Sequence, residues 1–134
     1  LLIEGANFAL FYFRERRREI MVFTRGDTYK FYFQRLDANG DVIQVRANEV
    51  WFTVKKDFVT TTCEIQKKLS DGTITYDPSD YTYHVTIQPE DTANFEYNTD
   101  YVYDIQILQD SVIKTISKGS IKVQPEVTFE RSIS

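Results

Sequence analysis

Apolar side chains alternate with polar ones along most of this chain, a period of two that excludes folds built mainly from helices. Successive side chains of an extended strand point to opposite faces, so such alternation predicts strands with one face in a core. The clearest alternation covers residues 81–88. The same pattern predicts strands over residues 29–34, 50–55, 63–68, 101–107 and 112–123. Amphipathic helical periodicity is not sustained over ten residues or more anywhere.

Turn-forming residues punctuate these strands. The stretch 37–41 (Asp-Ala-Asn-Gly-Asp) predicts a hairpin turn, because Asn and Gly tolerate the positive φ that such turns require. Asp71 and Gly72 mark a second turn. The run 89–92 (Pro-Glu-Asp-Thr) predicts one helical turn, with proline setting φ and acids at the N-terminus. Gly119 predicts a bulge or bend in the last strand, which is either continuous or split there.

Together these features predict an all-β protein, an immunoglobulin-like antiparallel β-sandwich of about seven strands with one short helical turn at Pro89 to Thr92. The segment from Glu90 to Ala93, followed by Tyr101, is similar to the loop that carries the tyrosine corner of immunoglobulin domains. The cysteine pair of those domains is absent, since the chain has one cysteine. The similarity therefore concerns topology and implies no immune role.

The first twenty residues differ from the rest, with an apolar stretch from Phe8 to Phe13 followed by a run of arginines and glutamates. The apolar stretch is too short to span a bilayer. The only methionine is Met21. One hypothesis is that natural translation begins at Met21, which makes residues 1–20 an extension outside the native protein and residues 21–134 the domain. The alternative, a genuine N-terminal strand or helix that packs on a neighbour, stays open.

Composition excludes several classes of function. The 134 residues carry 16 Lys plus Arg against 20 Asp plus Glu, a net charge of −4, which argues against a nucleic-acid partner. We expect no membrane partner either. One cysteine and one histidine exclude multi-cysteine zinc sites and most triad chemistry. We expect no metal and no cofactor.

Cys63 and His84 are the only candidates for a thiol nucleophile and its base. Alternation predicts that Cys63 faces the core and His84 faces solvent, so we expect a buried inert thiol and a surface imidazole. The sequence thus predicts no catalytic residue and no enzyme.

Two short motifs have simpler structural explanations. Asp37, Asn39 and Asp41 are spaced like the start of a calcium loop, but the twelfth position is an asparagine where a bidentate acid is needed. Residues 25–27 spell Arg-Gly-Asp, a tripeptide that some adhesion receptors recognise. Because it directly precedes a strand, we expect Gly26 to serve a backbone turn.

Trp51 is the one large aromatic residue that alternation places on the outer face of its strand, next to Glu49 and Thr53. Tryptophan is enriched at interface hot spots, so Trp51 marks a candidate contact surface. A shift of the alternation by one residue would instead put Trp51 in the core, and both possibilities stay open.

Several segments, taken in order, resemble a family of phage and prophage domains from Gram-positive bacteria, that of the N-terminal domain of the phage baseplate upper protein. The matching pieces extend from about Met21 to Phe129. They comprise Arg25 to Thr28, Asp37 to Gly40, Phe52 to Lys55, Pro89 to Thr92, Tyr101 to Ile105, Lys114 to Ile116 with Gly119, and Val127 with Thr128. The resemblance implies an immunoglobulin-like, non-catalytic structural protein of the virion, in the tail, baseplate or a related assembly.

That resemblance also implies a docking module whose partners are other virion proteins or copies of itself, located in the virion after assembly in the host cytoplasm. We expect the contact element to be an edge strand near Trp51 or the last strand, 112–123. The alternative function is a carbohydrate-binding β-sandwich module, because exposed tyrosine and tryptophan can stack on sugar rings.

Overall fold

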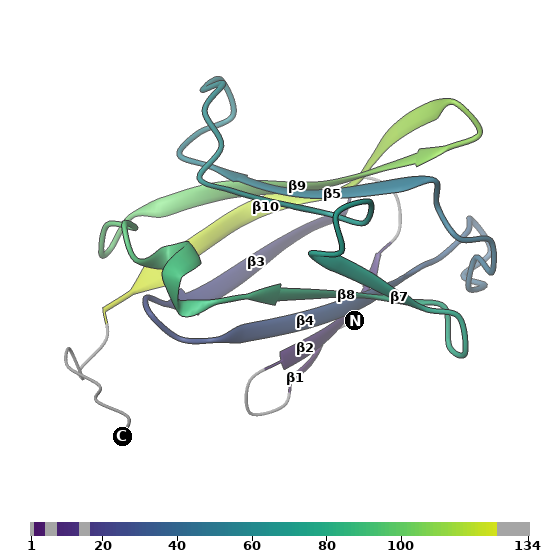
Figure 1. The fold of residues 1–134 in the computed structure, drawn as a ribbon, viewed down its shortest axis with the longest axis horizontal. Helices are drawn as coiled ribbons and strands as arrows, with labels where there is room; N and C mark the ends of the chain where they lie inside the picture. The colour runs from purple at the N-terminus through teal and green to yellow at the C-terminus, as the bar shows by residue number, and fades with distance from the viewer. Residues whose placement is uncertain (1, 5–7, 14–16, 126–134) are drawn as a thin grey trace.

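The computed structural model describes residues 2–4, 8–13 and 17–125, with side chains described from Met21 onward. Its elements are β1 (Leu2–Glu4), β2 (Phe8–Phe13), β3 (Arg17–Thr24), β4 (Tyr29–Arg35), β5 (Glu49–Lys55), β6 (Ile65–Lys68), β7 (Ile74–Asp77), β8 (Thr82–Ile87), the 3₁₀ turn η1 (Pro89–Thr92), β9 (Asp100–Gln109) and β10 (Val112–Gln124). The strands form two layers, as Figure 1 shows. The predicted all-β sandwich, with its one helical turn, is therefore confirmed.

Each layer is a five-stranded sheet. Sheet A has the order β1-β2-β4-β8-β7, and sheet B has the order β3-β10-β9-β5-β6. Most neighbours are antiparallel, but β2 pairs with β4 and β3 pairs with β10 in parallel. The runs β4-β8-β7 and β10-β9-β5-β6 match the strand order of the two immunoglobulin sheets.

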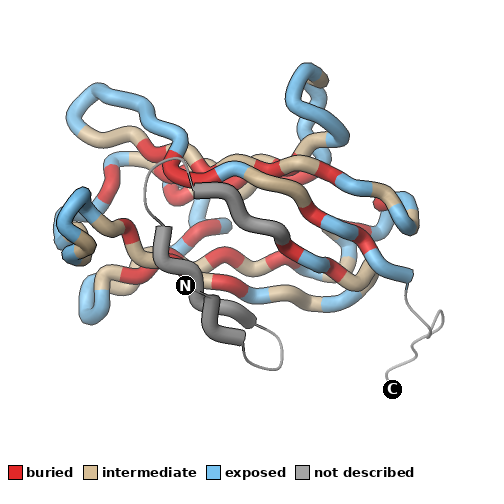
Figure 2. Tube along the Cα trace, turned by 180° about the vertical axis from the view of Figure 1, so that it is seen from behind, coloured by how far each residue is buried: buried red, intermediate tan, exposed pale blue. Residues whose placement is uncertain are grey.

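The core between the sheets follows from the alternation in the sequence. Along β4 the side chains of Phe31 and Phe33 are buried, and along β5 those of Val50, Phe52 and Val54 are buried. Figure 2 shows buried positions recurring along the strands while the loops are exposed. Burial of apolar area at about 25 cal/mol per Å² makes this face the main source of stability.

Aromatic side chains dominate the packing between the layers. Phe31 of sheet A meets Phe52 of sheet B edge to face, with ring centroids 5.1 Å apart. Phe33 stacks on Tyr83 at 5.2 Å. The Tyr83 hydroxyl is buried and accepts a hydrogen bond from the Ala47 N–H at 3.0 Å. The core thus tolerates buried tyrosine because its polar end is paired.

The segment between η1 and β9 forms the predicted tyrosine corner. The Tyr101 hydroxyl accepts a hydrogen bond from the Glu96 N–H at 2.9 Å, five residues upstream. Phe95 stacks on the Tyr101 ring with centroids 4.3 Å apart. This pairing fixes how the chain crosses from sheet A to sheet B.

The structure departs from the sequence-based expectations in three places. It contains β7, a four-residue strand too short to show alternation. The irregularity in β10 lies between Thr115 and Ser117, while Gly119 pairs in register with Tyr103, so the prediction of a bulge at Gly119 is wrong. The third departure is β6, which begins at Ile65 and leaves Cys63 exposed in the preceding loop, so the predicted burial of Cys63 is also wrong.

Strand β3 spans Arg17–Thr24 and therefore crosses the position where the sequence suggested a boundary, between residues 20 and 21. Its backbone pairs with β10 over its full length. Strands β1 and β2 lie at the β4 side of sheet A. Whether natural translation begins at Met21 stays a prediction.

Candidate functional site

Trp51 lies on the outer face of sheet B. Its neighbours along β5, Val50 and Phe52, are fully buried, whereas Trp51 is half-buried. The residues opposite it in the sheet are Gln106 of β9 and Lys68 of β6. Alternation therefore predicted the correct face for Trp51.

Sheet B ends at β6, directly beside Trp51, and β6 is an edge strand of the kind expected near that residue. Strand β5 pairs with β6 on one side and β9 on the other. Strand β10 pairs with β9, and from Ser117 to Gln124 it also pairs with β3. An edge strand near Trp51 is therefore present. Within 112–123, the segment from Val112 to Ile116 has β9 as its one neighbouring strand among the residues described, whereas 117–123 lies between two strands. Whether either of these is the contact element stays a prediction.

A small hollow opens on the same outer face, beneath the loop that joins β5 to β6. Its volume is about 60 Å³, and its lining consists of Thr53, Lys55, Phe58, Val102, Tyr103 and Asp104. Asp104 lines it from β9, where it pairs with Thr53 across to β5 and with Lys118 across to β10. Side chains directly opposite on one face of a sheet interact.

The carboxylate of Asp104 is half-buried and has no hydrogen-bond donor among the residues described. Burial raises its pKa, and the positive charges of Lys55 and Lys118 oppose that rise without cancelling it. No hydrogen bond contributes to the shift, and among the residues described the carboxylate has no ion-pair partner within 4 Å. A half-buried carboxylate without a donor is a group that a ligand could satisfy.

The β5–β6 loop above the hollow is held in shape by Asp57. Its Oδ1 accepts hydrogen bonds from the Val59 N–H at 3.0 Å, and from the N–H and hydroxyl of Thr60 at 2.8 and 2.7 Å. The Thr60 hydroxyl contributes most to the lowered pKa of Asp57. This turn presents Phe58, 58% exposed, and Val59, 89% exposed, to solvent.

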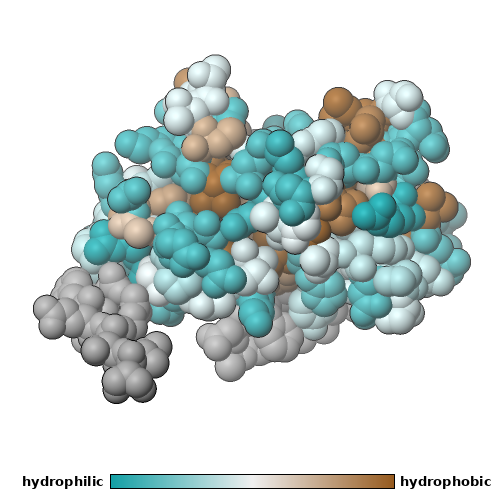
Figure 3. All heavy atoms as spheres, viewed as in Figure 1, coloured by the Kyte–Doolittle hydropathy of each residue, from teal (hydrophilic) through white to brown (hydrophobic). Residues whose placement is uncertain are grey.

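The β9–β10 hairpin projects from the other end of sheet B (Figure 1). Asp110 and Ser111 form its turn with φ values of 51° and 68°, and the Asn48 side chain accepts the Asp110 N–H at 2.9 Å. Val112 and Ile113 follow directly and are 53% and 61% exposed. Figure 3 shows hydrophobic atoms at both projecting loops, with mainly hydrophilic atoms between them.

The structure does not bring Cys63 and His84 together. Cys63 lies in the β5–β6 loop of sheet B. His84 lies in β8 of sheet A, where it stacks on Tyr32 at 5.1 Å and its Nε2 is 2.8 Å from the Thr82 hydroxyl. The two residues belong to different layers and form no nucleophile–base pair.

The two short motifs form turns, as predicted. Asp37 Oδ1 accepts hydrogen bonds from the N–H groups of Asn39 and Asp41, and Gly40 has a φ of 85°. In the second motif Gly26 has a φ of 84°, and its N–H donates to the Thr92 hydroxyl at 2.9 Å. The preceding arginine packs over the Tyr97 ring at 4.2 Å.

The part of the chain with described side chains contains no group of three or more His, Cys, Asp or Glu residues placed to hold a metal. In the same part, no helix is long and apolar enough to cross a membrane.

Sequence reasoning missed the hollow and its acid. Asp104 could have been identified as outward-facing, because it lies between Tyr103 and Ile105 in an alternating strand. The place of Phe58 in the lining of the hollow could not have been identified, because the loop that carries Phe58 has no periodicity. The hollow exists only where this loop returns over the sheet.

Comparison with solved structures finds a similar fold in the N-terminal domain of phage TP901-1 ORF48. The TM-score is 0.51 and the sequence identity is 10%, and the match covers 88% of this chain and 97% of that one. No protein-family model matches the sequence. No curated protein matches it either. The likeness concerns the fold, over nearly the whole sandwich.

Proposed function

We propose that this protein is a non-catalytic structural component of a phage or prophage virion, which docks other virion proteins in the tail, baseplate or a related assembly. The observation that supports the proposal is the fold shared with a phage domain over 88% of the chain. The resemblance of residues 21–129 to the baseplate upper protein domains points in the same direction. The protein would be located in the virion.

The surface of sheet B suggests how such docking occurs. The aliphatic tip at Val112 and Ile113 projects on a hairpin whose turn is braced by Asn48. A projecting apolar tip on a rigid hairpin can insert into a pocket of a partner and exclude water. Trp51 lies on the same outer face, closer to the middle of sheet B. Repetition of such contacts around a symmetric particle would turn modest affinity into firm attachment.

Mass spectrometry of purified particles tests the proposal. The strain that encodes the chain is treated to induce its prophage, and particles are purified by density gradient. We expect peptides of this chain in the particle fraction at a fixed ratio to the tail proteins. Presence of the chain in the lysate but not in intact particles would contradict the proposal.

A variant pair tests the contact element. Ile113→Asp places a charge at the hairpin tip, and we expect it to reduce incorporation into particles at least about tenfold. Val45→Asp is the matched control, because Val45 is also an exposed aliphatic residue, 62% exposed, and lies outside the hairpin. Equal incorporation of both variants would exclude the hairpin tip as the contact.

A further inference from the structure

We propose that the hollow beside Asp104 binds a saccharide, which places two neighbouring hydroxyl groups between the Asp104 carboxylate and the Lys55 ammonium group. Such a site adds a ligand to the proposed structural role. It depends on none of the evidence for that role.

Charge in the hollow selects a neutral ligand. The lining contains one carboxylate, Asp104, and one ammonium group, Lys55, so its charges balance, and Lys118 lies next to Asp104 on β10. An incoming ammonium or guanidinium group would meet the two lysines, and an incoming carboxylate or phosphate would meet Asp104. A hydroxyl group fits both, because it donates to a carboxylate and accepts from an ammonium group.

The remaining walls suit a sugar ring. Phe58 lines the hollow and is 58% exposed, so one side is an apolar aromatic surface. Thr53 lines the floor, and its Oγ1 accepts a hydrogen bond from Gln66 Nε2 at 3.3 Å, which orients its hydroxyl. A few convergent polar groups beside an aromatic wall are typical of small-molecule sites.

The size of the hollow determines how much of the ligand enters. A volume of about 60 Å³ holds roughly four water molecules, which is less than a sugar ring occupies. The hydroxyl groups therefore enter the hollow while the ring lies in its open mouth against Phe58. Displacing waters with hydroxyls preserves the hydrogen bonds of the polar groups.

Trp51 extends the site along the same face. It lies two residues before Thr53 on β5, a rise of about 7 Å along a strand. A second sugar unit bound in the hollow's mouth would reach this half-buried ring. Because Trp51 is the only tryptophan in the chain, its fluorescence reports on the occupied site directly.

The experiment is a titration of the full chain with chitotriose, cellotriose, maltotriose and lactose. Trp51 fluorescence and amide chemical shifts are followed. We expect at least one of these sugars to bind saturably with a Kd of about 1 mM, an affinity of about 4 kcal/mol. The shifts should be confined to residues 51–58 and 102–104. No saturable change with any of the four sugars, or changes confined to sheet A, would overturn the proposal.

Two variants and a control locate the binding. Asp104→Asn keeps the shape of the side chain but removes the charge, and Phe58→Ala removes the aromatic wall. We expect each to weaken binding at least about tenfold. Asp100→Asn is the matched control, since Asp100 is an exposed acid on the same strand and does not line the hollow. Thermal melting verifies that each variant is folded.

Equal affinity in Asp104→Asn and the natural protein would overturn the proposal. A protein ligand is the other possible occupant. Loss of particle incorporation in Asp104→Asn, combined with no sugar binding by the natural protein, would assign the hollow to a protein contact instead. Particle incorporation with no sugar binding would leave the structural role intact and refute only the saccharide site.

Discussion

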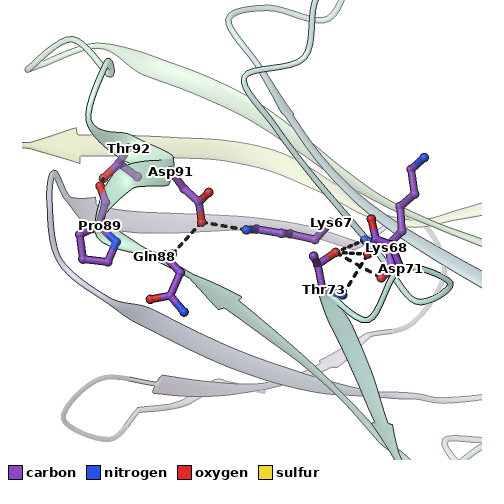
Figure 4. A network of polar contacts seen from close by, with 8 residues as sticks. All are labelled: Lys67, Lys68, Asp71, Thr73, Gln88, Pro89, Asp91 and Thr92. Atoms are coloured by element: carbon purple, nitrogen blue, oxygen red, sulfur yellow. Dashed lines mark hydrogen bonds and ion pairs between the residues drawn. The ribbon is translucent and has the colours of Figure 1, made fainter.

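The ammonium group of Lys67 lies 2.8 Å from the Asp91 carboxylate, and this ion pair joins the edge of sheet B to the 3₁₀ turn that follows sheet A (Figure 4). Lys67 pairs with the buried Phe52 on β5, so its side chain points between the layers. The same Asp91 Oδ2 accepts the Gln88 N–H at 2.7 Å. One carboxylate thus caps η1 and ties the two sheets together.

Because the Lys67 and Asp91 side chains are only 12% and 21% exposed, their ion pair should contribute to stability. We expect Asp91→Asn to lower the free energy of unfolding by about 2 kcal/mol, between the values typical of exposed and buried pairs. A double-mutant cycle with Lys67→Met, measured by urea unfolding, should give a coupling energy of about 1 kcal/mol or more. The control pair is Lys56 and Glu96, 3.9 Å apart and more than half exposed, where we expect coupling near zero. Equal coupling in both pairs would refute this account.

The tyrosine corner predicts a contrast between two nearby tyrosines. Tyr101→Phe leaves the Glu96 N–H without its acceptor, and we expect a loss of about 1–2 kcal/mol. Tyr97→Phe is the matched change, because the buried Tyr97 hydroxyl has no hydrogen-bond partner among the residues described. Its removal should be neutral or slightly stabilising. Thermal unfolding of both variants decides the matter, and an equal loss in the two would contradict the prediction.

Asp104 predicts an unusual dependence of stability on pH. Its pKa is raised in the folded protein by burial, so the folded state binds more protons than the unfolded state between the ordinary Asp pKa of about 3.9 and the raised value. The ionisation of Asp104 therefore lowers the free energy of unfolding as pH rises across that window. We expect Asp104→Asn to be more stable than the natural protein at pH 7, with the difference shrinking as pH falls through that window and absent below about 4.

Comparison of the natural protein with Asp104→Asn at each pH isolates the contribution of Asp104 to stability. Asp57, Asp71 and Asp77 have lowered pKa values, chiefly because the hydroxyls of Thr60, Thr73 and Ser79 donate to them. Their contribution is present above the unfolded pKa and is lost as pH falls through the folded pKa, in both proteins alike. A natural protein more stable than Asp104→Asn at pH 7 would contradict the predicted sign.

The exposure of Cys63 predicts rapid labelling. As the only thiol of the chain, it should react completely with a thiol reagent in the folded protein, without prior unfolding. Cys63→Ser should change the free energy of unfolding by no more than about 0.5 kcal/mol. Labelling that occurs only in denaturant would show that the thiol is buried.

The alternation of residues 29–34, 50–55 and 101–107 sufficed to predict three core strands and the outward face of Trp51, because side-chain direction in a strand depends only on local backbone geometry. Turn chemistry at Gly40 and Pro89 was equally local. Strand β7 and the start of β6 were not predictable, since four residues carry too little pattern.

The amino-acid sequence by itself determined the class of fold, the core face of each long strand and the absence of a cysteine or histidine cluster. Only the tertiary structure decided which strands are edges, because strand neighbours depend on contacts between residues far apart in sequence. It also decided that Asp104 and Phe58 line one hollow and that Lys67 forms an ion pair with Asp91. These arrangements form when loops and turns from separate segments pack on one sheet or between the two sheets. No local sequence pattern encodes which distant segments come together.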